Sequence, residues 1–439
     1  MKKHLLAASV LLAGFTASAQ EVQFEEYDLD NGLHVILHQD NTAPVVTTSV
    51  MYEVGGKDGD RERTGFAHFF EHLLFEGTKN IERGSWFKIV SSNGGTNNAT
   101  TSLDRTYYYE VFPSNNLQLG LWMESERMLH PVIDTVGVNT QNEVVKEERR
   151  QSYDNRPYAG ILEAIQKNLF VKHPYKDPNV GYMDHLDAAT LEEFLAFKEK
   201  YYVPNNAVLV VAGDFETAST KKMIKDYFEA VPRGKDVERN YPVETDITEA
   251  IKAKAYDSNI QIPALVNGYR TPGFASRDAR VLDMISSYLS DGKSSKLYKR
   301  LVDEKKMALA VQAINLGLQD YSMYILFALP QGENTMADLQ KEIDDEIVKL
   351  QTELISDRDY QKLQNKFENR FVSSNSSVEG IASSLATYYM LYDDVNLINT
   401  EIDIYRSITP QEIMSVAKKY LKPNARVELE YLPESAKEN

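Results

Sequence analysis

The sequence predicts an α+β protein built from two similar halves, each a β-sheet with covering helices. Two segments match without a gap at an offset of 219 residues: Thr190-LEEFLAFKEKYYVPNNAVLVV and Thr409-PQEIMSVAKKYLKPNARVELE. Each reads as an amphipathic helix, a Pro-Asn stop and an alternating strand. No G-x-G-x-x-G follows a first strand, so a dinucleotide-binding fold is not expected. We therefore predict an internal duplication whose halves enclose a cavity.

The order of the parts along the chain follows from composition. Residues 1–19 begin with two lysines after Met1, continue as an apolar run and end on Ala-Ser-Ala, which is the pattern of a secretory signal peptide. We expect a first domain at residues 20–236, a polar linker at 237–250 and a second, homologous domain at 251–439. No later stretch approaches twenty apolar residues, so we expect no membrane span. The signal peptide predicts export across the inner membrane, most simply to the periplasm.

Composition restricts the possible chemistry. The 439 residues include 48 Lys+Arg, 65 Asp+Glu and no Cys, with a net charge of −17. Such an acidic chain is a poor ligand for phosphate backbones, so nucleic-acid binding is not expected. Without cysteine, disulfides, thiolate metal sites and thiol nucleophiles are excluded. Any metal must be held by His, Asp or Glu, and all eight histidines precede residue 186. A site with histidine ligands can therefore form only in the first half.

The segment Thr64-GFAHFFEHLLFEGT carries the candidate metal site. Thr64 is a candidate N-cap and Gly77 a candidate end of the helix. His68 and His72 stand four apart, so one helix face presents both imidazoles to a single point, and Glu71 lies beside them. This H-x-x-E-H order inverts the usual zinc helix motif. Two imidazoles are suitable zinc ligands, and the carboxylate is a candidate general base.

A catalytic zinc needs three protein ligands, and the run NEVVKEERRQ at 142–151 offers the third. On a helix, Glu148 shares a face with Val144 and Val145, which predicts that it turns inward. Glu147 points about 100° away. We therefore expect Glu148 to complete the metal site.

The other histidines predict no metal site. His34 and His38 are also four apart, but the run LHVILH alternates like a strand, which separates the two by about 13 Å. We expect both to face solvent. His130, His173 and His185 have no partners at metal spacing, so no role is predicted for them.

With these residues, the chain resembles the pitrilysin/insulinase zinc peptidases, a family that includes the mitochondrial processing peptidase and short bacterial relatives. The resemblance covers essentially the whole mature chain. Four further segments fit the family pattern: Tyr27-DLDNGLHVIL, Gly94-GTNNATTSLDRTYYYEVFP, Tyr202-VPNNAVLVVAGDF and Leu289-SDGKSSKLYKRL.

The resemblance implies a zinc-dependent endopeptidase that hydrolyses peptides or unfolded segments. It implies one Zn²⁺ per chain, with the metal ligands His68, His72 and Glu148 and the general base Glu71. Two other functions remain open: a non-catalytic scaffold or peptide-binding subunit, and a metal-storage protein. The four intact site residues favour the enzyme.

The resemblance also implies a substrate-binding strand. Asn98, Ala99 and Thr100 correspond to the family's edge strand, which pairs with the substrate backbone and so accepts many peptide sequences.

Two departures from the family pattern concern activity. Relatives usually carry a Glu seven residues before the ligand Glu, where this chain has Gln141. We expect a lower activity or compensation by Glu143 or Glu147. Active relatives often use an Arg and a Tyr, seven apart in the second half, to hold the substrate, and no such pair follows residue 250. We therefore predict a homodimer, or a heterodimer with a family member that lacks zinc ligands but supplies this clamp.

Overall fold

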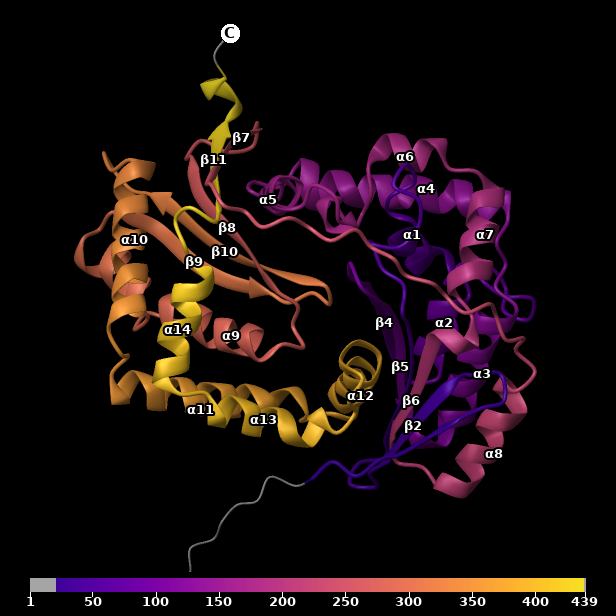
Figure 1. Cartoon of the computed structure of the whole chain (residues 1–439). Coiled ribbons are helices and arrows are strands. Elements are labelled where there is room, and N and C mark those ends of the chain that lie inside the picture. The colour runs from indigo at the N-terminus through magenta and orange to yellow at the C-terminus, as the bar shows by residue number, and fades with distance from the viewer. Residues whose placement is uncertain (1–20, 438–439) are drawn as a thin grey trace, which may run out of the picture.

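The computed structural model describes residues 21–437 and contains one sheet in each half (Figure 1). The predicted signal peptide lies outside the described residues. The first half contributes the strands β1 (Glu25–Asp28), β2 (His34–Gln39), β3 (Val45–Tyr52), β4 (Thr96–Thr101), β5 (Thr106–Pro113) and β6 (Ala207–Gly213). The second half contributes β7 (Ile251–Asp257), β8 (Ala264–Pro272), β9 (Ala308–Leu316), β10 (Tyr321–Pro330) and β11 (Val427–Pro433).

Helices cover both sheets. Those of the first half are α1 (Phe66–Leu73), α2 (Trp86–Ser92), α3 (Leu117–Leu129), α4 (Thr135–Arg149), α5 (Ile161–Leu169), α6 (Met183–Ala188), α7 (Leu191–Tyr201) and α8 (Thr217–Phe228). Those of the second half are α9 (Arg277–Ser290), α10 (Met336–Thr352), α11 (Asp357–Ser374), α12 (Val378–Tyr392), α13 (Leu397–Ser407) and α14 (Pro410–Tyr420). Within residues 21–437, none of these helices combines the length and the apolar character needed to cross a bilayer.

The predicted duplication is confirmed by the topology of the two sheets. The first has the order β1-β2-β6-β3-β5-β4 and the second β7-β11-β8-β10-β9, so the two orders agree apart from β1. In both sheets the strand after the repeated helix runs parallel to one neighbour, β6 to β2 and β11 to β7. The repeated helices α7 and α14 begin with matching capping boxes, Thr190 with Glu193 and Thr409 with Glu412.

Each half lends one helix to the sheet of the other half (Figure 1). Helix α5 of the first half packs on β7, β8 and β11, where Ile165 and Leu169 join a core with Val266 and Leu429. Helix α12 of the second half packs on β3 and β6, where its buried Leu385 joins the residues of the first sheet. This exchange buries apolar surface of both sheets, which makes the halves mutually dependent.

The prediction that His34 and His38 face solvent is wrong. Both side chains lie in the core, with residue exposures of 7% and 8%. Their face of β2 is covered by α12, whose Tyr389 ring stacks on the His34 imidazole at 3.7 Å. His38 Nδ1 bonds to the Gln23 carbonyl oxygen (2.7 Å). The covering helix lies some 350 positions away in the sequence, so the local strand pattern contains no sign of it.

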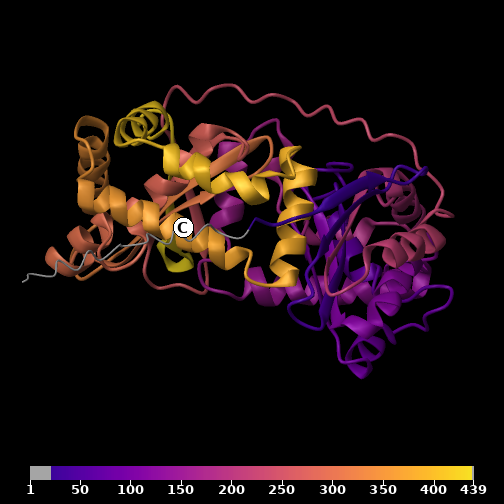
Figure 2. The same ribbon diagram turned by 90° about the horizontal axis from the view of Figure 1, so that it is seen from below.

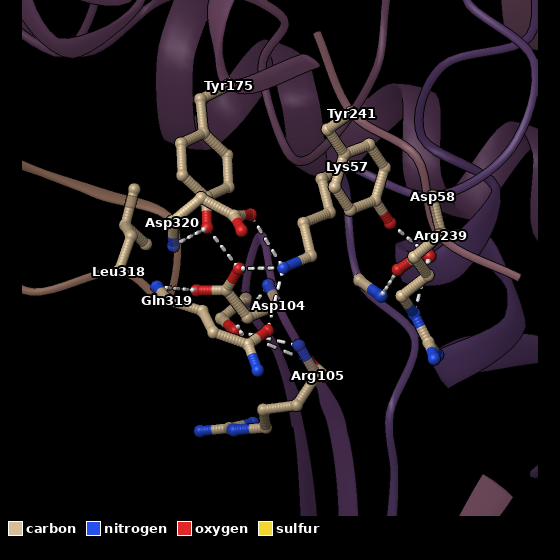
Figure 3. Close-up of polar contacts among 12 residues, drawn as sticks. Lys57, Asp58, Asp104, Arg105, Tyr175, Arg239, Tyr241, Leu318, Gln319 and Asp320 are labelled. Carbon is tan, nitrogen blue, oxygen red and sulfur yellow. Dashed lines mark hydrogen bonds and ion pairs between the residues drawn. The ribbon is translucent and has the colours of Figure 1, made fainter. Parts of the chain in front are cut away.

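A buried ionic contact joins equivalent turns of the two sheets (Figure 3). Lys57 Nζ lies 2.9 Å from an oxygen of Asp104, in the β4–β5 turn, and 2.9 Å from one of Asp320, in the β9–β10 turn. The Gln319 N–H donates to Asp104 (3.0 Å), and the Tyr175 hydroxyl also donates to Asp104. Burial alone would lower the pKa of Lys57, but the two carboxylates outweigh it and raise that pKa above its usual value.

The segment between α8 and β7 is an extended strap that crosses from one half to the other (Figure 2). The Tyr241 hydroxyl donates to Asp58 (2.7 Å). Glu244 Oε1 accepts hydrogen bonds from the N–H groups of Val171, Lys172 and His173 at 2.6–2.8 Å. The strap is therefore fixed to the first half by specific contacts along its length.

We expect Lys57→Met to lower the free energy of unfolding by about 3–5 kcal/mol, because it leaves two carboxylates without their buried cation. Urea denaturation monitored by circular dichroism measures this loss. The control is Lys254→Met, since Lys254 forms an exposed pair with Glu430 (3.6 Å) and its loss should cost less than about 1 kcal/mol. Equal losses of unfolding free energy in the two variants would show that the buried contact of Lys57 stabilises the fold no more than an exposed ion pair does.

Candidate active site

Helix α1, which carries the H-x-x-E-H motif, is held by an aromatic core. Phe66 and Phe69 each lie 4.5 Å from the ring of Phe194 on α7, and Phe70 stacks on Tyr202 at 4.9 Å. These apolar residues occupy the inner face of the helix. His68, Glu71 and His72 are therefore turned toward α4 and β4, which pack beside α1.

The start of α1 differs from the prediction. The N-cap is Gly65, not Thr64, and Gly65 has φ +89°, a conformation that favours glycine. A side chain at Gly65 would also meet the Val180 carbonyl oxygen at 2.7 Å. The Thr64 hydroxyl instead contacts His185 Nδ1 (2.9 Å) and accepts a hydrogen bond from the Tyr182 N–H (3.2 Å). His185, for which no role was predicted, thus helps to place the helix.

The structure brings the three predicted metal ligands together. His68 Nε2 lies 3.6 Å from one oxygen of Glu148, and His72 Nε2 lies 3.1 Å from the other. One donor atom from each residue falls within 4.8 Å of the others. Hydrogen bonds from His68 and then His72 hold the pKa of the Glu148 carboxyl well below its usual range. Two imidazoles and a carboxylate form a donor set of catalytic zinc sites, so these residues fit that metal.

Helix α4 orients Glu148 as the helical pattern predicts, although one of the two reasons for it is wrong. Val145 is fully buried and fixes the inner face, whereas Val144 is 44% exposed. Glu147 points to solvent and pairs with Arg150 (3.1 Å). The helix begins at Asp134, whose side chain accepts from the Gly137 N–H (2.8 Å).

Glu71 stands between the metal ligands and the edge of the first sheet. Its Oε2 accepts a hydrogen bond from Thr101 Oγ1 (2.6 Å), at the end of β4. The Thr101 carbonyl accepts in turn from Asn179 Nδ2 (2.8 Å). Thr101 and Asn179 were not predicted as site residues, because their roles depend on contacts that no local motif reveals.

The predicted substrate strand is β4, the outermost strand of the first sheet. The hairpin closes with a hydrogen bond from the Ser102 N–H to the Arg105 carbonyl (2.8 Å). Because antiparallel partners alternate between bonded and non-bonded pairs, Asn98 and Thr100 direct their backbone groups to β5. Ala99 directs its N–H and C=O to the outer edge, where an extended peptide could pair with them.

Gln141 contacts a carboxylate that the sequence did not single out. Its Nε2 donates to Glu76 Oε1 (2.6 Å), and Glu76 is buried just beyond α1. Glu143 is exposed and pairs with Lys146 (3.0 Å). Glu143 and Glu147 both form ion pairs with cations at the helix surface. The carboxylate that contacts Gln141 is therefore that of Glu76.

Two family models match the chain. Residues 34–181 match the model described as Insulinase (Peptidase family M16), and residues 188–367 match the model described as Peptidase M16 inactive domain. The chain therefore belongs to the pitrilysin/insulinase family, peptidase family M16, as its motifs predicted.

Among individual relatives, the zinc protease PqqE of Helicobacter pylori is 31% identical over 430 residues, which cover 96% of each chain. The uncharacterized zinc protease YmxG of Bacillus subtilis is 22% identical and covers 86% of this chain and 93% of its own. Several relatives are thus named zinc proteases.

Solved structures have the same architecture. A protease from Helicobacter pylori, 29% identical, superimposes with a TM-score of 0.89 over 94% of this chain and 100% of its own. The periplasmic protease PqqL from Escherichia coli, 19% identical, gives 0.76 over 93% of this chain and 47% of its own, which shows a common fold.

We expect Glu148→Gln to weaken zinc binding about a hundredfold or more, because it removes the anionic donor that faces both imidazoles. Competition with a chromophoric chelator measures the zinc affinity directly. The neighbouring Glu147→Gln is the matched control, since Glu147 points to solvent, and it should bind zinc like the wild type. Equal affinities for both variants would contradict the assignment of Glu148.

Proposed function

We propose that the protein is a zinc-dependent endopeptidase that cleaves peptides or unfolded segments. The observation that carries this proposal is the convergence of His68, His72 and Glu148 next to Glu71, at the end of the edge strand β4. One zinc ion per chain, held by these three donors, would polarise the scissile carbonyl and lower the pKa of a bound water.

Glu71 is the proposed general base. Its Oε2 is held by Thr101 (2.6 Å), and Oε1 has no hydrogen-bond partner within residues 21–437. Oε1 is thus available to take a proton from the attacking water and pass it to the leaving amine. The hydrogen bond from the Thr101 hydroxyl restrains the orientation of the carboxylate.

The substrate would bind as an added strand on β4. The outward N–H and C=O of Ala99 would pair with its backbone, while the side chains of Asn98 and Thr100 would lie on one face of the strand beside it. Main-chain pairing gives affinity without a fixed sequence, which suits a peptidase for unfolded segments.

We place the enzyme in the periplasm and expect it to act as a dimer. The predicted signal at residues 1–19 and the description of PqqL as a periplasmic protease support the location. The missing Arg/Tyr clamp supports a partner, either a second copy or an inactive family member that supplies the clamp. Cleavage assays on size-exclusion fractions test this, because a fully active monomer would contradict it.

The second candidate function is a non-catalytic scaffold or peptide-binding subunit. It is favoured by Gln141, which stands where relatives usually carry a Glu, and by the missing clamp. The intact set of metal ligands and base favours the enzyme.

We expect Glu71→Gln to retain about one zinc per chain and to cleave peptides about 100-fold more slowly or worse, as expected when a general base is removed. Metal analysis and a fluorogenic peptide assay measure the two properties. The exposed Glu82→Gln serves as control and should match the wild type. If Glu71→Gln cleaves as fast as wild type, the proposed mechanism is wrong; if zinc-loaded wild type cleaves nothing, the scaffold function takes its place.

A further inference from the structure

Arg105, at the hairpin between β4 and β5, forms no ion pair with any of the residues that the structure describes. Its Nη1 donates to the Thr100 carbonyl oxygen (2.6 Å) and to Thr100 Oγ1 (2.5 Å). Its guanidinium carbon lies 5.8 Å from the centre of the Tyr107 ring. Within residues 21–437, no carboxylate oxygen lies within 4.0 Å of it. Figure 3 shows the side chain extended away from the Lys57 cluster.

The neighbouring carboxylates are committed to other groups. Asp104, the preceding residue, bonds to Lys57 (2.9 Å) in the contact between the halves. Glu71 accepts from Thr101 (2.6 Å). Burial lowers the pKa of Arg105, as expected for a partly desolvated cation that lacks a close anion. An arriving carboxylate would therefore meet a guanidinium that forms no ion pair with any of residues 21–437.

The guanidinium lies where a bound peptide would place alternate side chains. The Ala99 side chain is buried in the first core, whereas Thr100 is exposed on the opposite face of β4, the face with Arg105. Thr100 directly precedes Thr101, the residue that bonds to Glu71. Because strand residues alternate between the two faces, every second side chain of a peptide paired with β4 would lie on the Arg105 face, opposite the face on which Thr101 bonds to Glu71.

We propose that Arg105 binds a carboxylate of the substrate, so that the enzyme selects peptides with Asp or Glu near the scissile bond. Guanidinium and carboxylate form charge-assisted and often bidentate hydrogen bonds. Nη1 is used by Thr100, while Nε and Nη2 form an edge of the guanidinium that bonds to none of residues 21–437 and can hold a carboxylate side-on. This inference rests on the proposed peptidase function and adds a substrate class to it.

Zinc-loaded enzyme is tested with peptides that carry Glu, Gln or Lys at one position, scanned across the cleavage site. At the position facing Arg105, wild type should cleave the Glu peptide with a kcat/KM about 10- to 100-fold above that of the Gln peptide, the range of a charged hydrogen bond. Arg105→Gln should lower the kcat/KM of the Glu peptide about 10- to 100-fold more than that of the Gln peptide, and Arg105→Glu should prefer Lys.

The control is Arg406→Gln, since Arg406 is exposed on α13 and pairs with Asp403 (3.1 Å); this variant should keep the preference for Glu. Two results overturn the inference while leaving peptide cleavage intact. One is equal rates for Glu and Gln peptides at every position of the wild-type scan. The other is a loss in Arg105→Gln by the same factor for both peptides, which would show that Arg105 only braces Thr100. If wild type cleaves no peptide, the proposed function fails and the inference fails with it.

Discussion

The relative placement of the two halves depends on the buried contact of Lys57 with Asp104 and Asp320. The two aspartates come from equivalent turns of the duplicated sheets, so one lysine pairs with the same turn in both copies. Removing the charges of Lys57 and Asp104 from water is costly, and the close pairing, together with hydrogen bonds from Gln319 and Tyr175, must offset that cost. Because such a contact loses its advantage when its atoms separate, it fixes how the second half faces β4.

The same duplication shows where the two halves differ and why the candidate metal site lies in only one of them. In the first sheet the connection from β3 to β4 contains α1, with His68, Glu71 and His72, whereas the equivalent connection from β8 to β9 contains α9, which has no histidine. Helix α9 instead buries Arg280 against Glu401 (2.8 Å). The second half still supplies α12 to the first sheet, so it supports the fold of the half that contains the candidate metal site.

Local patterns predicted much of this arrangement, and long-range contacts account for the rest. The repeated helix–strand unit predicted the duplication, and helical geometry placed Glu148 opposite the two histidines. His34 was expected in solvent because its cover, α12, is remote in sequence, and the same remoteness hid the partners of Lys57. Thr64 has a typical N-cap side chain, but the N-cap is Gly65, which adopts a positive φ. The N-cap preference for threonine could not indicate this backbone conformation. The sequence predicted no role for Arg105, because whether a charged side chain has an ion-pair partner depends on its three-dimensional surroundings.

The central claim is that the convergence of His68, His72 and Glu148 is a zinc site in one half of a duplicated chain. Anomalous diffraction at the zinc edge, on crystals of protein purified with zinc, tests this most directly. The account predicts one strong anomalous peak per chain, bounded by Nε2 of both histidines and by the Glu148 carboxylate. A peak bound by other residues, or zinc-supplemented crystals with no peak at these three, would contradict it.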